Sequence, residues 1–222
     1  MSFILNIDTA ISTASVCLAR DGIAIQFAEN KIQKGHTSWL HIAIRELMKK
    51  ESLNFSDLNA IAVSIGPGSY TGLRIGLSAA KGLCYALKSP LITVGTLEMM
   101  AYAAREEPVD LLCPMIDARR NEVFTAVYDK EFHVVLEPQA MILQEDNFDQ
   151  LLSKNKILFF GNGSNKLQTM IQNKLWQEKM IFKEIDINVS CMISLSNSKF
   201  NNNILANLSY TEPGYLKDFH LP

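Results

Sequence analysis

The sequence has few cysteines, little net charge and no long hydrophobic run. Its four cysteines, Cys17, Cys84, Cys113 and Cys191, lie far apart, so the CxxC spacing of zinc sites and redox motifs is missing. We therefore expect reduced and mostly buried thiols. A net charge of −2 over 222 residues gives no basic footprint for direct RNA binding by this chain.

Signals for membranes and secretion are also missing. No apolar run approaches the ~20 residues of a membrane-spanning helix, and residues 1–7 lack the basic region of a secretory signal. We therefore expect a cytoplasmic protein with no membrane association. Apolar material is abundant, because 48% of the residues are hydrophobic. A chain of this length can build one large domain or two small lobes.

The order strand, strand, strand, helix, strand, helix occurs twice along the chain. Residues 3–8 form a predicted buried strand, and Asp21-Gly22 between two β-prone runs predicts a hairpin. Residues 111–117 resemble the opening strand and begin the second copy. The repeated order predicts a duplicated α/β fold.

This repeat divides the chain into two predicted lobes. The N-terminal lobe spans residues 1–104 and the C-terminal lobe spans residues 105–222, with a tail from about residue 210 that returns to the first lobe. The Asn- and Ser-rich residues 194–203 have weak helix propensity. We nevertheless expect a last helix over residues 189–208.

A glycine-rich segment, residues 66–76, joins a predicted strand to a predicted helix over residues 70–87. Gly68 can adopt a positive φ, and Ser69 or Thr71 can cap the helix. The segment lacks the Lys-Ser/Thr of a Walker A loop and the glycine spacing of a dinucleotide fingerprint. Two readings stay open: a structural turn, or an anion site in which Gly68 and Ser69 are the candidate cofactor-binding residues.

The helix that follows carries Gly72, Gly76 and Ala80 four residues apart, on one face. Glycine inside a helix costs up to ~1 kcal/mol against alanine. This stripe therefore indicates close approach of another helix. That helix is either the chain's own first helix or a helix of a partner subunit.

Several segments together resemble the TsaB (YeaZ) family. They follow the family's order and cover nearly the whole chain. They are IDTA (7–10), HT (36–37), GPGSYTGLRIGLSAAKGL (66–83), VGTLE (94–98), IDARRNEV (116–123), GNG (161–163) and EPGYLK (212–217).

The resemblance implies a two-lobed fold of the actin/hexokinase/Hsp70 (ASKHA, ribonuclease H-like) type. It also implies a role in forming N6-threonylcarbamoyladenosine at position 37 of tRNA. The expected partners are the catalytic subunit TsaD and the small ATPase TsaE, with tRNA engaged only through the complex. A homodimer is expected when the chain is alone.

The catalytic relative is implied to hold a metal through a His-x-x-x-His pair, and Thr96 and Met100 occupy the matching positions here. Hydroxyl and thioether groups do not replace two imidazoles. His36 and His41 are five residues apart, so on a helix they diverge. We therefore expect no metal or cofactor in this subunit, whereas the assembled complex uses ATP and a metal in other subunits.

Asp8 and Asp117 each end a first strand, where kinases of this fold place carboxylates. Asp8 is the best candidate for vestigial chemistry and, with Gly68 and Ser69, a candidate cofactor-binding residue, or else it is a polar strand end that bonds a nearby turn. We find no complete catalytic constellation and expect a non-catalytic scaffold subunit that dimerises with TsaD. The alternative is a free-standing nucleotide-dependent enzyme. The expected interface residues are His36, Thr37, Leu40, Ile44, Gly72, Leu73, Ile75, Gly76, Ala79 and Ala80.

Overall fold

The computed structural model describes residues 1–31, 36–171 and 176–217, without the side chains of residues 36 and 37. The chain divides into two compact units. The first contains Met1–Met99 and Asn188–Gly214, and the second contains Met100–Ile187 and the tail from Tyr215. Each unit is described by itself.

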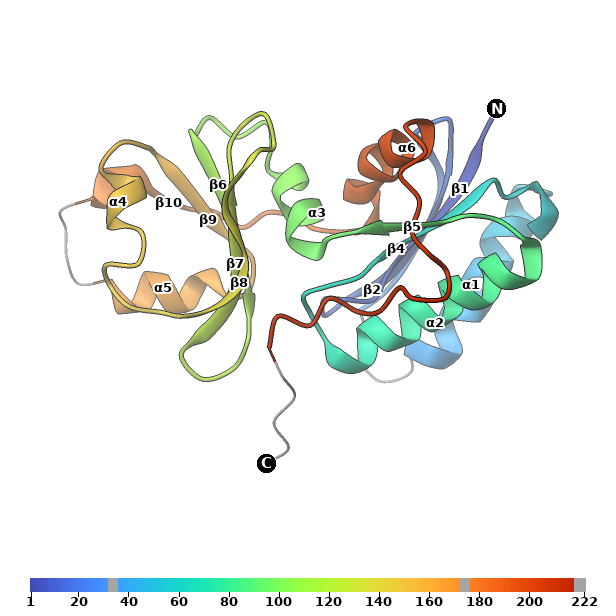
Figure 1. The fold of residues 1–222 in the computed structure, drawn as a ribbon, viewed down its shortest axis with the longest axis horizontal. Helices are drawn as coiled ribbons and strands as arrows, with labels where there is room; N and C mark the ends of the chain where they lie inside the picture. The colour runs from blue at the N-terminus through green and yellow to red at the C-terminus, as the bar shows by residue number, and fades with distance from the viewer. Residues whose placement is uncertain (32–35, 172–175, 218–222) are drawn as a thin grey trace. The chain divides into compact units, whose positions relative to one another are not determined.

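The first unit is a five-stranded mixed sheet with helices on both faces (Figure 1). The strand order is β3-β2-β1-β4-β5, in which β1, β2 and β3 are antiparallel and β4 and β5 run parallel to β1. Its elements are β1 (Phe3–Asp8), β2 (Ala14–Arg20), β3 (Ile23–Asn30), α1 (His36–Lys50), η1 (Phe55–Asp57), β4 (Ala60–Ser64), α2 (Tyr70–Leu87), β5 (Leu91–Val94), η3 (Val189–Met192) and α6 (Ile193–Asn201).

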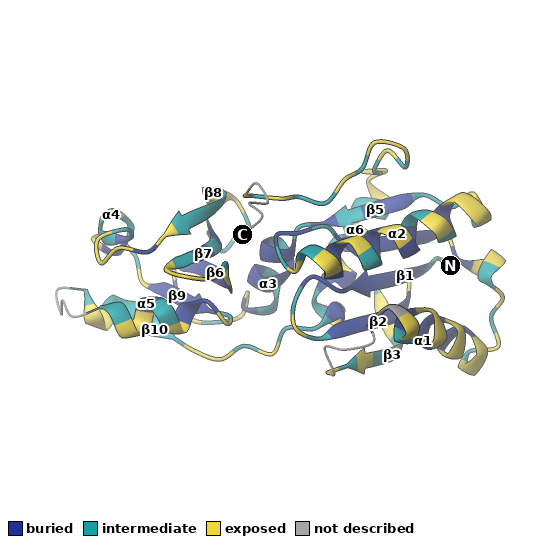
Figure 2. Ribbon diagram, turned by 90° about the horizontal axis from the view of Figure 1, so that it is seen from below, coloured by how far each residue is buried: buried dark blue, intermediate teal, exposed yellow. Residues whose placement is uncertain are grey.

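Alternation along the strands decides which side chains meet which helices. Leu5, Ile7 and Val63 face α1 and α2, where they form one apolar cluster with Leu40 and Leu77. Figure 2 shows this pattern as buried strands beneath helices whose outer sides are exposed. The core of the first unit therefore lies between the sheet and the pair α1 and α2.

The opposite face of this sheet is covered by α6. Asn6 alternates with Leu5 and Ile7, and its buried Oδ1 accepts a hydrogen bond from Ser196 Oγ at 2.6 Å. Lys199 donates to Thr93 O at 3.1 Å. The Asn- and Ser-rich segment thus forms a helix because its polar residues bond polar groups of β1 and β5.

The second unit repeats this topology. Its sheet has the order β10-β9-β6-β7-β8, which corresponds strand for strand to the first sheet. The elements are β6 (Leu111–Asp117), β7 (Glu122–Tyr128), β8 (Val134–Ile142), α4 (Asp149–Leu152), β9 (Ile157–Phe160), α5 (Ser164–Met170), η2 (Gln177–Lys179) and β10 (Met180–Phe182), and α3 (Thr96–Ala103) joins the two units. The predicted duplicated α/β fold is confirmed.

The division between the units differs from the expected boundary at residues 104 and 105. The whole stretch Asn188–Gly214, and not only a tail from about residue 210, belongs to the first unit. It is held there by Val189 N, which bonds Ser15 Oγ, and by Gly214 N, which bonds Ile65 O at 2.7 Å. The chain then passes back to the second unit at Tyr215.

The last helix is shorter than expected. The last helix ends at Asn201 rather than near residue 208, because Asn202 and Asn203 leave the helix and Asn203 adopts a positive φ of 55°. Helix α4 has four residues, Asp149–Leu152. The hairpin at Asp21-Gly22 is confirmed, and both of its turn residues have positive φ.

Three of the four free cysteines are buried, and Cys191 is half-buried. Burial raises the pKa of Cys17 and of Cys113 to about 12. These thiols therefore stay protonated at neutral pH and act as small apolar side chains. Among the described helices, none has the length and apolar content that crossing a membrane requires.

Candidate functional site

The glycine-rich segment packs against the chain itself. Gly66, rather than Gly68, adopts a positive φ, of 119°. Gly68 is required for space, because a Cβ there would lie 2.3 Å from Ala10 O. Ser69 caps α2 by accepting a hydrogen bond from Gly72 N, and its own N–H donates to Ala10 O at 2.7 Å. Both candidate anion-binding residues are thus engaged in the turn that starts α2.

Asp8 is fully buried at the end of β1. Its Oδ1 accepts hydrogen bonds from Ser64 Oγ at 2.5 Å and from Ala10 N at 3.0 Å. Its Oδ2 has no hydrogen-bond partner among the described residues. Burial raises the pKa of Asp8, and the two hydrogen bonds partly oppose that rise. The carboxyl therefore holds a turn in an environment that disfavours its charged form.

The glycine stripe on α2 faces inward. A Cβ at Gly72 would lie 2.0 Å from Thr9 O, and a Cβ at Gly76 would lie 2.3 Å from Thr9 Oγ1. Thr9 Oγ1 also donates a hydrogen bond to Gly72 O at 2.7 Å. The stripe therefore lets α2 approach the loop after β1. This corrects both expectations for it, since neither the first helix nor a partner's helix occupies that face.

Four further expected interface residues are also interior. Leu40, Ile44, Leu73 and Ala80 are each 2% exposed or less. Leu40, Ile44 and Ala80 belong to the core cluster between the helices and the sheet, and Leu73 lies beside Gly66. Their side chains are part of this chain's core, so they present no surface to a partner. His36 and Thr37 begin α1, and their side chains lie outside the description.

The outer side of α2 forms a concave surface that encloses a shallow volume of about 660 Å³. Residues of α2 line it together with His41 of α1. Two expected interface residues, Ile75 and Ala79, are among them, whereas Arg74, Ser78 and Gly82 are exposed lining residues that the sequence analysis missed.

Spacing alone could have identified this face. The exposed positions Thr71, Arg74, Ser78 and Gly82 recur every three or four residues along α2, one helical stripe away from the glycines. Gly82 has no atom within 4 Å of an added Cβ. Nothing within the described chain therefore explains a glycine at this helix position.

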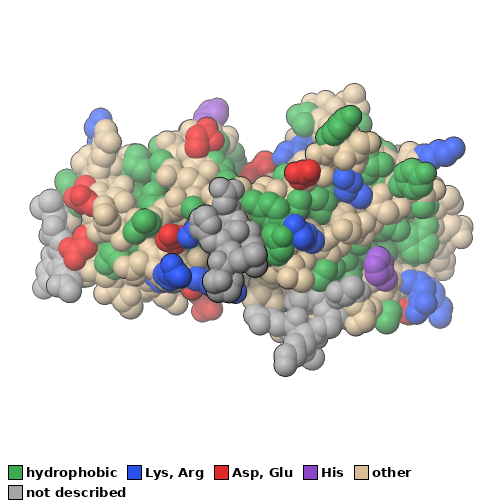
Figure 3. All heavy atoms as spheres, turned by 60° about the horizontal axis from the view of Figure 1, so that its bottom comes forward, with side chains coloured by type: hydrophobic (Ala, Val, Ile, Leu, Met, Phe, Trp, Pro, Cys, Tyr) green, Lys and Arg blue, Asp and Glu red, His purple; other side chains and the backbone are tan. Residues whose placement is uncertain are grey.

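The surface is both apolar and basic. Arg74 lies over the ring of Tyr70, 4.1 Å from its centroid. Figure 3 shows hydrophobic, basic and histidine side chains on the side of the first unit that α1 and α2 form. A stacked guanidinium beside small residues suits contact with another protein better than it suits a reaction.

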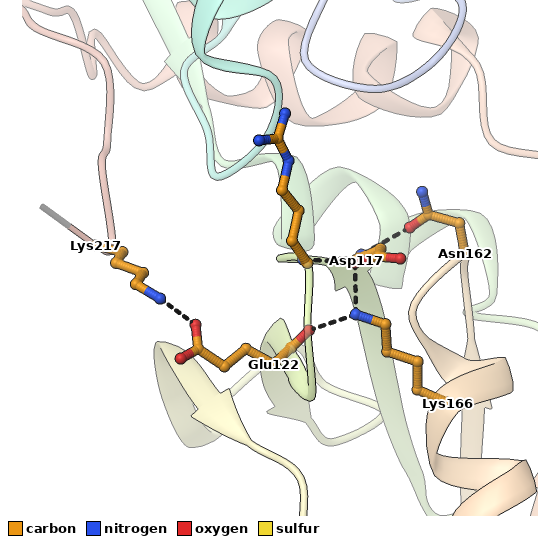
Figure 4. Close-up of polar contacts among 6 residues, drawn as sticks. Asp117, Glu122, Asn162, Lys166 and Lys217 are labelled. Atoms are coloured by element: carbon orange, nitrogen blue, oxygen red, sulfur yellow. Dashed lines mark hydrogen bonds and ion pairs between the residues drawn. The ribbon is translucent and has the colours of Figure 1, made fainter. Parts of the chain in front are cut away.

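In the second unit, Asp117 at the end of β6 forms an ion pair with Lys166 (Figure 4). Lys166 Nζ lies 2.6 Å from Asp117 Oδ1 and donates to Glu122 O at 3.0 Å. The Lys166 ammonium lowers the pKa of Asp117 most. Asn162 Oδ1 accepts from Asp117 N, and Lys217 pairs with the Glu122 carboxylate. The Lys166 ammonium thus contacts the Asp117 oxygen that a bound cation would need as a ligand.

The residues at the His-x-x-x-His positions are buried. Thr96 is 0% exposed and Met100 is 2% exposed. Within the described residues, one group of three metal-ligating side chains gathers, Asp129, Glu131 and His133 at the β7–β8 turn. Glu131 and His133 are exposed and Asp129 is half-buried, and His133 bonds both carboxylate oxygens of Asp129 through its backbone N–H and its ring. These hydrogen bonds account for the cluster as part of the turn.

Comparison with known proteins agrees with these features. The family model "tRNA N6-adenosine threonylcarbamoyltransferase" (TsaD) matches residues 27–220. The tRNA threonylcarbamoyladenosine biosynthesis protein TsaB of Bacillus subtilis is 32% identical over 175 residues, which span 78% of this chain and 76% of that protein. TsaB of Escherichia coli is 36% identical over 129 residues, or 58% of this chain and 55% of that protein.

A crystal structure from Pseudomonas aeruginosa, described as an uncharacterized protein with similarity to peptidase YEAZ, shares the fold. It has a TM-score of 0.84 and 24% identity, and it covers 98% of this chain and 100% of its own. Both units and the order of their elements are therefore present in a solved structure. With the sequence matches, this shows that the chain belongs to the TsaB (YeaZ) family.

Proposed function

We propose that this chain is a non-catalytic subunit that supports N6-threonylcarbamoyladenosine formation at position 37 of tRNA by docking on the catalytic subunit TsaD. Family membership supports the pathway, because the relatives are tRNA threonylcarbamoyladenosine biosynthesis proteins. The match to the transferase family model supports a common fold with the catalytic subunit. The docking face is the outer side of α1 and α2.

The observation that carries the proposal is the surface of α2. Small or polar residues follow its exposed side at helical spacing, and Gly82 leaves open space above the helix axis. A mid-helix glycine costs about 1 kcal/mol relative to alanine when nothing packs on it. Close packing of a partner helix would explain a glycine at position 82, which the contacts of the described chain do not explain.

The surroundings of the candidate catalytic side chains, within the described residues, support a non-catalytic role. Asp8 is enclosed and bonded to its own turn. Asp117 is paired with Lys166. Thr96 and Met100 offer a hydroxyl and a thioether in a buried position. These side chains do not form a set of converging carboxylates and imidazoles for a metal-bound nucleotide. We therefore assign no cofactor to this subunit and place ATP and metal in other subunits of the complex.

The test is co-purification with the catalytic subunit encoded by the same genome. Gly82→Trp places a large side chain in the open space, so the variant should stay folded and lose the complex. Asn165→Trp, on the exposed side of α5 in the second unit, is the matched control and should bind as wild type does. Normal co-purification of Gly82→Trp would remove this face from the interface.

A free-standing nucleotide-dependent enzyme of the same fold is the alternative function. Turnover of Mg-ATP by the purified chain without any partner would establish it instead. The small ATPase TsaE and the tRNA bound through the complex complete the proposed assembly, and the chain by itself is expected to form a homodimer. Each of these stays a prediction, as does the cytoplasmic location.

A further inference from the structure

The charges of the two docking helices differ in sign from the charge of the chain. Helices α1 and α2 carry five Lys and Arg residues and one Glu, which is a net charge of +4. The whole chain has a net charge of −2. Helix α2 contains no acidic residue, and Glu46 of α1 lies 3.7 Å from Arg45. The excess of positive charge is therefore a local property of these two helices.

Part of this charge is directed at the concave surface. Arg74 lines it and stacks on Tyr70. On α1, His41 lines the same surface, and Arg45 and Lys49 continue its row at intervals of four residues, all of them exposed. Lys81 is held by the backbone oxygens of Ser209 and Thr211 and contributes less.

From this pattern we propose that the partner surface seated on α1 and α2 carries carboxylates, one of them opposite Arg74. The proposal rests on the function proposed above and specifies the chemistry of its partner. Apolar contact with Ile75 and Leu83 supplies packing, and pairing across the interface sets the partner's identity.

The same charges oppose a symmetric dimer of this chain. A two-fold interface places one patch against its own copy. Two helix pairs of net charge +4 then meet, and Glu46 is the one carboxylate that α1 and α2 offer to the basic residues of the copy. The acidic partner is therefore favoured over the second copy, most strongly at low salt, where charges are screened least.

The test measures the dissociation constant between this chain and the catalytic subunit in 50 mM and in 500 mM NaCl. The constant should increase roughly tenfold with salt, as expected for attraction between exposed charges of opposite sign. Arg74→Glu should raise it roughly tenfold at 50 mM NaCl and reduce its salt dependence. Sedimentation of the chain alone should show self-association that strengthens with salt, the opposite direction.

Lys154→Glu makes the same charge change at an exposed position of the second unit and is the matched control, with an expected change below about twofold. Arg74→Ala serves as a second variant, and circular dichroism checks the fold of each protein. A complex whose affinity is independent of salt, or Arg74→Glu bound as tightly as wild type, overturns this inference alone. No complex at either salt concentration overturns the proposed function as well.

Discussion

Replacing two glycines of α2 by alanine should change stability in opposite directions. Gly82 is exposed within the helix, and an added Cβ meets no atom within 4 Å. Gly82→Ala should therefore increase the free energy of unfolding by about 1 kcal/mol, because alanine has the higher helix propensity and lowers the entropy of the unfolded chain. On helix propensity alone, Gly76→Ala would give the same gain.

Packing reverses the sign at Gly76. Its Cβ would lie 2.3 Å from Thr9 Oγ1, so that hydroxyl must move and its hydrogen bond to Gly72 O is strained or broken. Overpacking costs about 1–3 kcal/mol, and a buried hydroxyl left without its acceptor costs about 1–3 kcal/mol. After the propensity gain of about 1 kcal/mol is subtracted, Gly76→Ala should be about 1–5 kcal/mol less stable than wild type.

Urea denaturation followed by far-ultraviolet circular dichroism measures both variants. A shift of 1 kcal/mol corresponds to roughly 2–4 °C in the melting temperature of a domain of this size. Thermal melts therefore check the same result. A stabilised Gly76→Ala, or a destabilised Gly82→Ala, would show that the two faces of α2 have been assigned the wrong way round.

Three further variants test individual contacts. Asp8→Asn should stabilise the protein more at pH 7.5 than at pH 4, because the raised pKa of buried Asp8 makes the wild type less stable as pH rises above the pKa of Asp8 in the unfolded chain. Equal effects at both pH values would contradict the burial argument. Ser196→Ala should lower the free energy of unfolding by about 1–3 kcal/mol in urea denaturation, since Asn6 Oδ1 loses its donor. An unchanged free energy would show that this hydrogen bond does not hold α6 on β1. Lys166→Met should lower the free energy of unfolding by at most about 1 kcal/mol at pH 7, because the ion pair with Asp117 is partly exposed. This loss should shrink as pH falls and the Asp117 carboxyl protonates, and a loss that persists at pH 2 would point to packing instead.

The sequence predicted the repeated topology because its signals are local. The Asp21-Gly22 pair fixes one hairpin, and a buried strand that ends in aspartate opens each copy at Asp8 and at Asp117. The positions of the two strand-end aspartates also follow from these runs. What surrounds each carboxyl does not follow, because Ser64 and Lys166 come from elements far along the chain.

The direction of the glycine stripe could not be read from spacing. A repeat of four residues shows that Gly72, Gly76 and Ala80 share a face, but the face that turns inward depends on Thr9, which is more than sixty residues away. The place of the C-terminal stretch could not be read from local sequence either, because Ser196 of α6 bonds Asn6 of β1, which lies 190 residues away. Both features depend on tertiary contacts that override local propensity.

The most direct test of a non-catalytic docking subunit is tRNA threonylcarbamoylation by the catalytic subunit supplied with variants of this chain. The double variant Asp8→Asn with Asp117→Asn, once shown to be folded and bound, should support at least about half of the wild-type rate, because neither carboxyl takes part in the reaction. Gly82→Trp should abolish the reaction by preventing assembly. A fall of about a hundredfold or more with the double variant, in a complex that still forms, would contradict the account and place a catalytic group in this chain.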